Sequence, residues 1–134
     1  MERLFRLIVI FCTLAWLTAC GESAIATPQK EGVVVTIRVA DVEEYRIRLT
    51  DPADIEIARK LLAGEEAPRI PNGVVVRGDP DVNVGYRWHI DPESVEFADS
   101  TMEVCDGLPS DVENEIITSD RYCPWSAEVI AIDE

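Results

Sequence analysis

A single histidine near a carboxylate and a hydroxyl is the first candidate for catalytic chemistry in this sequence. His89 is the only histidine, and Asp91 and Ser94 follow it closely. A histidine oriented by a carboxylate can serve as the general base for a hydroxyl nucleophile. Pro92 breaks the segment, however, and the sequence has no G-x-S-x-G nucleophile elbow. We therefore expect His89 to be structural or to lie at the surface, where it would fix the turn at Asp91 by hydrogen bonding.

Oxygen-bearing side chains at alternate positions give a second candidate, a calcium site. Asp79, Asp81 and Asn83 have the spacing with which a calcium-binding loop begins. An EF-hand loop would continue with glycine at the sixth position and glutamate at the twelfth. This sequence has Val84 and Ile90 there, so an acidic group from elsewhere would have to complete the site. We expect no other cofactor.

Arginines on the polar side of the expected strands give a third candidate, a strip that binds anions or carboxylates. They are Arg38, Arg46, Arg48 and Arg87. The guanidinium group suits such recognition because it donates two parallel hydrogen bonds to a carboxylate. The alternative is that each arginine pairs across strands with a glutamate. For a binding surface, the sequence points to Arg46, Arg48 and Arg87 together with His89 and Asp91.

The elements that position these residues follow from hydrophobic periodicity. Residues 33–39 and 44–49 alternate apolar and polar side chains, as half-buried strands do, and residues 41–43 join them as a hairpin turn. Residues 52–63 predict the one strong helix. Asp51 suits its cap, Pro52 its first position and Gly64 its end. We expect this helix to lie on one face of a sheet.

Shorter elements are expected further along the chain. The predicted strands are residues 74–77, 86–90, 95–97, 102–105 and 128–132. Alternation places Trp88 on the apolar side of its strand and Arg87 and His89 on the other. Ser110 can cap a short helix that carries Ile116. Residues 33–134 thus predict a single globular domain of the α+β class, a mostly antiparallel sheet with one principal helix packed on it.

The N-terminus indicates export and a lipid anchor. Residues 1–19 read as a lipoprotein signal peptide, since two arginines precede an apolar stretch too short to span a bilayer. The stretch ends in Leu17-Thr18-Ala19-Cys20, which is typical of a bacterial lipobox. We expect Cys20 to carry the lipid, residues 20–32 to form a flexible tether, and the domain to lie on the extracytoplasmic face of a cell membrane. The alternative is an ordinary secretory peptide cut after Ala19.

The net charge limits the possible binding partners, and the cysteine content predicts a disulfide. The formal net charge of −14 disfavours nucleic acid and anionic lipid surfaces, so membrane attachment would depend on the lipid anchor. Export permits disulfides. With Cys12 in the signal peptide and Cys20 lipidated, the remaining Cys105 and Cys123 predict one disulfide. A zinc site is the alternative, and it would have to recruit His89 and a carboxylate.

Several short sequences together resemble a known family. They are LTDP at 49–52, WHIDP at 88–92, EVCDG at 103–107 and YCPWS at 122–126. This order is similar to that in a family of small secreted bacterial domains and in the N-terminal domain of a slime-mould protein labelled calmodulin-binding. The resemblance covers residues 33–129 and implies the domain boundary and the disulfide, but no activity. Calmodulin targets are basic amphipathic helices, and residues 52–63 mix acidic with basic side chains.

Two classes of function follow. The first is a noncatalytic binding or adhesion module that recognises a protein, a peptide or a glycan through loops on a rigid sheet. The second is a small hydrolase that uses a pair of carboxylates from Asp79, Asp81, Asp91 and Glu93, with or without a metal. The sequence favours binding because it lacks a nucleophile with its base, metal-ligand spacing and a phosphate loop.

Overall fold

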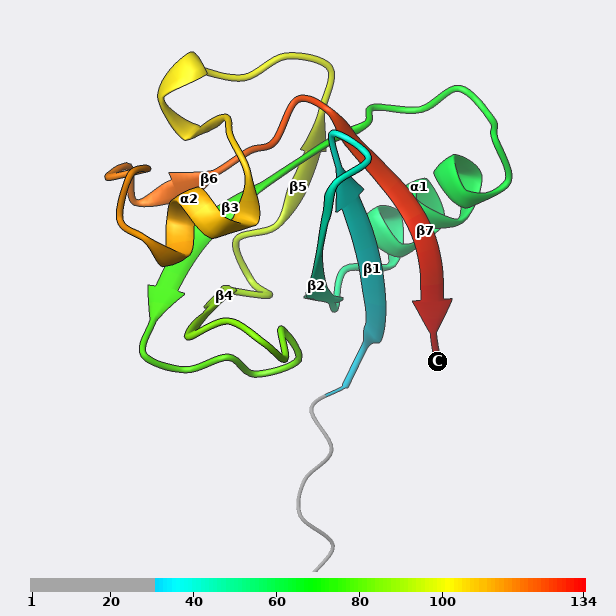
Figure 1. Cartoon of the computed structure of the whole chain (residues 1–134). Coiled ribbons are helices and arrows are strands. Elements are labelled where there is room, and N and C mark those ends of the chain that lie inside the picture. The colour runs from blue at the N-terminus through cyan, green and yellow to red at the C-terminus, as the bar shows by residue number, and fades with distance from the viewer. Residues whose placement is uncertain (1–30) are drawn as a thin grey trace, which may run out of the picture.

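The computed structural model describes residues 31–134, and a three-stranded sheet of order β2-β1-β7 runs through it (Figure 1). β1 (Val33–Val39) and β2 (Glu43–Leu49) form the predicted hairpin, and β7 (Ala127–Asp133) pairs antiparallel with the other side of β1. Valine, isoleucine, leucine and tyrosine at alternate positions of β1 and β2 are buried. This sheet therefore has one apolar face toward the core and one polar face outside, as the alternation predicted.

The hairpin turn is fastened to the beginning of β7. Ala40 and Asp41 have φ angles of 51° and 59°, the left-handed conformation that reverses the chain between β1 and β2. The backbone N–H of Ala40 donates to the backbone oxygen of Ser126 over 2.9 Å. This bond extends the β1–β7 ladder by one pair beyond Val39 and Ala127.

A second sheet is built around β3 (Ile70–Arg77). β4 (Trp88–Ile90), β5 (Glu96–Ala98) and β6 (Arg121–Tyr122) all pair antiparallel with it. β3 begins at Ile70, four residues before the predicted start, because Ile70 and Pro71 are buried and pair with β5. β6 was not predicted, since its two residues carry no periodic pattern.

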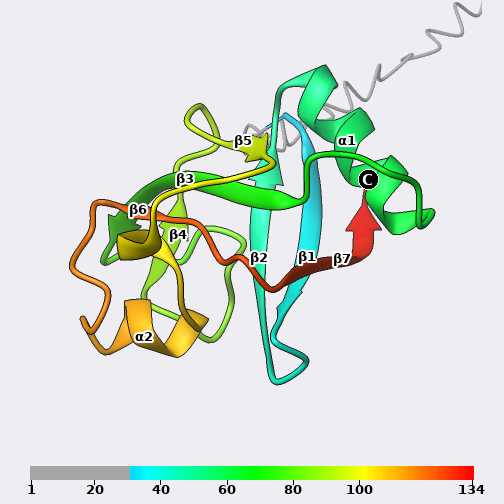
Figure 2. The same cartoon turned by 90° about the horizontal axis from the view of Figure 1, so that it is seen from above.

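The predicted principal helix is confirmed as α1 (Pro52–Leu62). The Asp51 carboxylate accepts a hydrogen bond from the N–H of Ala53 over 2.7 Å, which caps the helix. Ile55, Ile57 and Leu61 pack against the core. α1 lies alongside β7 in both views of the fold (Figures 1 and 2).

Two of the shorter predicted elements were wrong in type or extent. Residues 102–105 were expected as a strand, but Glu103–Cys105 form a turn of 3-10 helix, η1. The short helix α2 (Pro109–Glu113) begins before Ser110 and is capped from within, since the Asp111 carboxylate accepts from the N–H of Leu108 over 2.8 Å. Ser110 instead donates its backbone N–H and its hydroxyl to Glu43 on β2.

An aromatic cluster fills the space between the two sheets. Tyr45 contacts Trp88 and Tyr122 with ring centroids 5.8 and 5.3 Å apart, and Trp88 contacts Tyr122 and Tyr86 at 5.5 and 5.6 Å. Burial raises the pKa of both Tyr45 and Tyr122 above the ordinary tyrosine value. These rings join residues from β2, β4 and β6 into one core.

The predicted disulfide between Cys105 and Cys123 is confirmed, and it joins η1 to the segment after β6. The N–H of Cys123 also donates to the backbone oxygen of Cys105 over 2.8 Å, so a backbone hydrogen bond accompanies the disulfide. The fold is α+β, mostly antiparallel sheet with one main helix, as predicted. Cys20 and the predicted signal peptide lie outside the described residues. Within residues 31–134, no helix has the length and apolar character needed to cross a membrane.

Candidate functional site

The loop between β3 and β4, residues 78–85, carries the three residues that the sequence suggests as calcium ligands, Asp79, Asp81 and Asn83. Gly78 and Gly85 open and close the loop with φ angles of 87° and 106°, in the left-handed region where glycine is unstrained. Asp79 accepts a hydrogen bond from the N–H of Asp81 over 3.0 Å, and the N–H of Asn83 donates to the backbone oxygen of Pro80. The loop thus has its own internal hydrogen bonds.

Asn83 fixes this loop to the first sheet. Its side chain is 1 % exposed. Its amide oxygen accepts from the backbone N–H of Arg46 on β2 over 3.0 Å, and its amide nitrogen donates to the backbone oxygen of Trp88 over 3.0 Å. An asparagine is suited to this position because one planar group both accepts and donates. Asn83 therefore covers the outer edge of β2.

An ion pair and the histidine add two further attachments. Arg48 on β2 meets Asp81 across 3.3 Å, with side chains only 15 % and 11 % exposed. His89 is buried, and its Nδ1 lies 2.6 Å from the backbone oxygen of Asp79. Because a carbonyl oxygen can only accept, Nδ1 carries a proton, and a neutral ring then presents Nε2 as an acceptor. The predicted role of His89 at the Asp91 turn differs from this contact, which is with the preceding loop.

A hollow of about 480 Å³ brings three of the predicted binding residues together. We call it the His89 hollow, and it is lined by Glu31, Arg48, Thr50, His89, Asp91, Pro92 and Glu93. Asp91 is held by its own turn, because its Oδ1 accepts from the N–H of Glu93 over 3.1 Å. The lining offers hydrogen-bond acceptors, a hydroxyl group and one guanidinium group.

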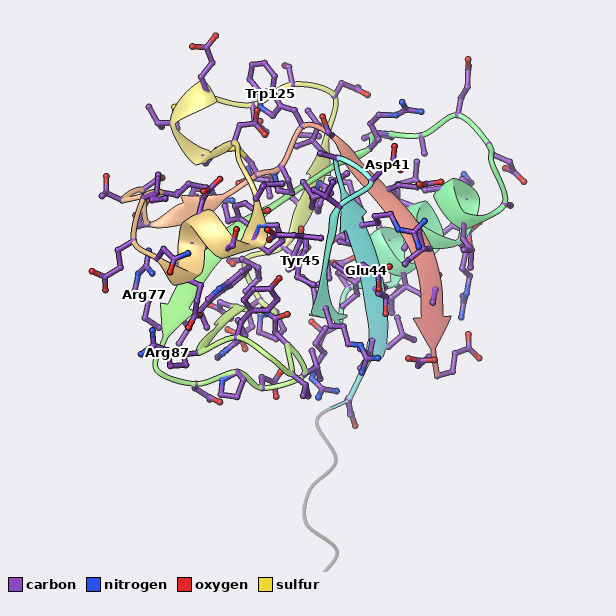
Figure 3. The ribbon with its side chains drawn as sticks, viewed as in Figure 1. Asp41, Glu44, Tyr45, Arg77, Arg87 and Trp125 are labelled. Carbon is purple, nitrogen blue, oxygen red and sulfur yellow. A yellow bond between two sulfur atoms is a disulfide. The ribbon has the colours of Figure 1, made fainter. Side chains whose placement is uncertain are left out.

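The other two predicted binding residues lie elsewhere. Arg87 lies close to Arg77 (Figure 3) and forms an ion pair with Glu113 over 2.6 Å. The N–H and guanidinium groups of Arg87 hold the pKa of Glu113 below its ordinary value. Arg46 is exposed on the polar face of β2. The expected single arginine strip does not form, because Arg38 pairs with Glu44, Arg48 with Asp81 and Arg87 with Glu113.

The proposed calcium ligands already have protein partners. Asn83 is bonded to two backbone groups, Asp81 pairs with Arg48, and the Asp79 carboxylate accepts from the backbone. Among residues 31–134, no three histidine, cysteine or acidic side chains gather as they would around a metal ion. In this conformation the side-chain oxygen atoms of the loop are bonded to the loop backbone and to β2.

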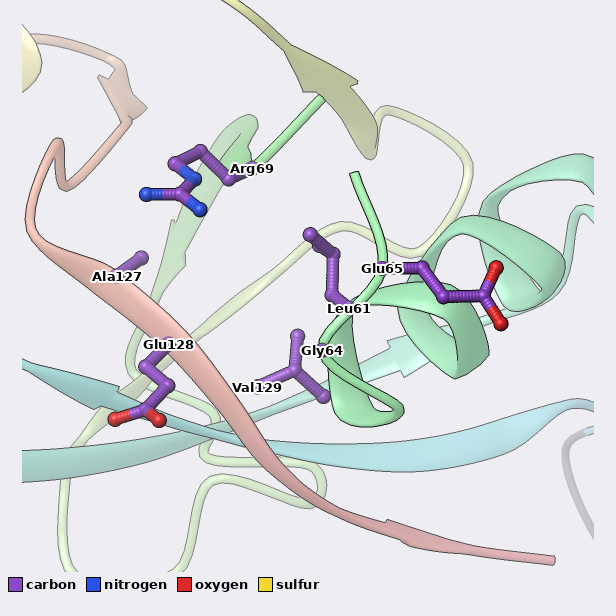
Figure 4. A pocket seen from close by; sticks show the side chains of 7 residues that line it. All are labelled: Leu61, Gly64, Glu65, Arg69, Ala127, Glu128 and Val129. Atoms are coloured by element: carbon purple, nitrogen blue, oxygen red, sulfur yellow. The ribbon is translucent and has the colours of Figure 1, made fainter. Parts of the chain in front are cut away.

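A second hollow, of about 310 Å³, was not predicted from the sequence. We call it the Arg69 hollow, and Figure 4 shows its lining of Leu61, Gly64, Glu65, Arg69, Ala127, Glu128 and Val129. It lies between the end of α1 and the edge of β7. No sequence pattern predicts this hollow, because its position depends on which strand forms the edge of the sheet. The available signal is Arg69 itself, a basic residue in a loop whose other charged residues are glutamates.

Comparison with known families assigns the chain to one of them. The family model for the N-terminal domain of calmodulin-binding protein 74 matches residues 31–134, so the chain belongs to this family. The match covers the whole described part of the chain and agrees with the resemblance to the slime-mould domain. Comparisons with curated proteins and with solved structures give no match.

Proposed function

We propose that this domain is a noncatalytic binding module that recognises its ligand through the His89 hollow. The observation that carries the proposal is that two side chains of the lining, Arg48 and His89, are already held in place by the loop 78–85, through Asp81 and the backbone oxygen of Asp79. Side chains fixed before binding lose little conformational entropy when a ligand arrives. The buried side chain of Asn83 in turn fixes this loop to β2.

The lining of the hollow favours a polar ligand rich in hydrogen-bond donors. His89 Nε2, Asp91 and Glu93 accept hydrogen bonds, and Thr50 both accepts and donates. Glycans and peptides present donors of this kind, whereas the net charge of −14 disfavours nucleic acid. The ligand class is therefore a glycan or a peptide, free or on a partner protein.

A hydrolase receives less support from the same residues. The Asp79 and Asp91 carboxylates accept from nearby backbone N–H groups, and Asp81 pairs with Arg48. The Ser94 hydroxyl donates to the backbone oxygen of Asp91 and accepts from the N–H of Val74, so it serves the turn. His89 is oriented by a carbonyl and not by a carboxylate.

The proposal includes the location of the module. We infer that Cys20 carries a lipid and that residues 20–32 tether the domain to the extracytoplasmic face of a membrane. A tethered domain with a preorganised polar hollow suits capture of ligands outside the cell.

Glycan and peptide arrays test the ligand class. The protein and a Thr50→Ala, Glu93→Gln variant are applied to both arrays, with Glu56→Gln on the exposed face of α1 as the matched charge control. We expect a restricted set of ligands that the double variant loses and the control retains. A broad hydrolase screen runs in parallel. Turnover that Asp91→Asn abolishes would overturn the binding proposal in favour of an enzyme.

A further inference from the structure

The outer edge of β7 presents unpaired backbone groups. β7 pairs with β1 and with no other strand of the described chain. The backbone N–H of Ala40 donates to the backbone oxygen of Ser126. In an antiparallel pair, every second residue points its backbone N–H and C=O toward the partner strand, so Ser126 and Glu128 point theirs toward β1. Those of Ala127 and Val129 therefore point outward. No residue from 31 to 134 bonds to these four outward N–H and C=O groups.

The two edge strands of this sheet, β2 and β7, differ in whether their outward backbone groups are covered. Asn83 occupies the edge of β2 by accepting from the N–H of Arg46. At the edge of β7, no side chain of the described residues bonds to the outward backbone groups. The regular pairing of β7 with β1 is interrupted by a register shift after Val129. Proteins usually cover or block such edges because an open edge pairs readily with another chain.

The Arg69 hollow provides the room for an added strand. Ala127 and Val129 are among its lining residues, so the hollow adjoins the open edge of β7, and Leu61 supplies an apolar wall opposite (Figure 4). Gly64 leaves the rim open, since no atom lies within 4 Å of where its Cβ would be. A strand added to β7 would lie about 4.8 Å away, inside this space.

Arg69 supplies an uncompensated positive charge at one end of the hollow. Five of the seven other arginines among residues 31–134 pair with carboxylates, namely Arg38, Arg48, Arg59, Arg87 and Arg121, and Arg77 donates to two backbone oxygens. Arg69 is exposed and makes no hydrogen bond or ion pair with any residue from 31 to 134. Its guanidinium group lies toward the Ala127 end, while the carboxylate of Glu65 points away from it (Figure 4). A carboxylate is the natural partner for such a group.

We propose that the edge of β7 binds an extended peptide in antiparallel orientation, with the C-terminal carboxylate of that peptide on Arg69. Antiparallel pairing runs the peptide toward Ala127, which brings its last residue to the guanidinium group. Backbone hydrogen bonds to Ala127 and Val129 give affinity, and one apolar side chain against Leu61 gives selectivity. Glu65 and Glu128 on the rim disfavour further acidic residues, so the ligand is apolar with an acidic end.

Fluorescence anisotropy with a defined peptide tests this site. The probe is an N-terminally labelled hexapeptide of alternating valine and threonine with a free carboxylate, and its C-terminal amide is the comparison. We expect saturable binding of the acid and roughly ten- to hundredfold weaker binding of the amide. Arg69→Gln should weaken binding of the free-acid peptide by the same factor. The control Lys60→Gln makes the same change of charge on α1 outside the hollow and should leave binding unchanged.

A backbone variant separates strand addition from simple charge attraction. Ala127→Pro removes an outward N–H, a change that edge strands tolerate, and should reduce binding of both peptides while the melting curve confirms folding. The proposal is overturned if neither peptide binds, or if Arg69→Gln and Ala127→Pro both leave binding intact. A concentration-dependent dimer that Ala127→Pro dissociates would also overturn it, since the occupant would then be a second copy of this chain. None of these outcomes depends on the His89 hollow.

Discussion

The amide oxygen of Asn83 accepts a hydrogen bond from the backbone N–H of Arg46, a residue 37 positions earlier in the chain. This contact joins a surface loop to the outer edge of the first sheet, at β2. It also satisfies two backbone groups at once, because the same side chain donates to Trp88 oxygen. The loop and the sheet edge therefore depend on one buried amide.

Replacing this amide should cost stability. Asn83→Ala leaves the N–H of Arg46 and the oxygen of Trp88 without partners, and we expect the free energy of unfolding to fall by about 2 to 3 kcal/mol. Asn83→Asp keeps the acceptor but loses the donor, so it should retain part of the stability. Urea unfolding measures both. Asn114→Ala, at an exposed asparagine after α2, is the control. Equal midpoints for the Asn83 and Asn114 variants would contradict the role of Asn83.

The elements that were predictable are those whose signals are local. The hairpin of β1 and β2 shows in alternating valines, and α1 shows in Asp51, Pro52 and Gly64, because caps and periodicity act within a few residues. η1 was not predictable. Its alternation resembles a strand, but no strand of the described residues pairs with it. Its contacts are the disulfide and the backbone bond between Cys123 and Cys105, which join distant parts of the chain.

The site was predictable only in part for the same reason. Arg48, His89 and Asp91 do meet in one hollow, since β2 and β4 contact each other and Asp91 directly follows β4. Arg87 does not join them, because it lies before β4 begins and pairs with Glu113 at the end of α2, a contact that alternation along a strand cannot predict. Asn83 was assigned to calcium from its spacing, whereas its burial and its contact with β2 follow from tertiary structure.

Loss of the disulfide should destabilise the fold measurably. The Cys105–Cys123 bond closes a loop with a sequence separation of 18, and removing such a link costs about 3 kcal/mol. We expect the Cys105→Ser, Cys123→Ser double variant to unfold at lower urea concentration than the oxidised protein. Reduced wild-type protein should match the variant. If reduction leaves the midpoint of the wild type unchanged, the disulfide does not contribute in this way.

Calcium should have little effect on stability. Binding at Asp79, Asp81 and Asn83 would have to break the Arg48 ion pair and the bonds of Asn83. We therefore expect the same melting temperature with millimolar calcium as with a chelator, since only ligands that bind the folded state raise it. A saturable rise that Asp79→Asn abolishes would restore the calcium site.

Membrane attachment should depend on Cys20. Cys20→Ser removes the thiol that we expect to carry the lipid, so the protein should move from the membrane fraction to the soluble fraction and lose a fatty-acid label. Cys12→Ser is the matched control, because it changes a cysteine inside the apolar stretch and should leave both readouts intact. An unlabelled wild-type protein would argue for an ordinary secretory peptide.

The aromatic core should resist ionisation until the protein unfolds in base. Burial raises the pKa of Tyr45 and Tyr122, and burial together with Glu43 raises that of Tyr86. In the unfolded chain tyrosine ionises near a pKa of about 10. Above that pH the unfolded state releases protons that the folded state keeps, so the free energy of unfolding falls as pH rises. Below it this contribution to stability is present in full.

An alkaline titration checks this directly. We expect tyrosinate absorbance to appear together with the loss of near-ultraviolet circular dichroism from the Trp88 environment, in one cooperative step above pH about 10. Tyr86→Phe should lower the amplitude of the step without moving the remaining tyrosines to lower pH, because Tyr45 and Tyr122 stay buried. Ionisation of all three tyrosines near their ordinary pKa, with the dichroism intact, would mean that water reaches the core between the two sheets.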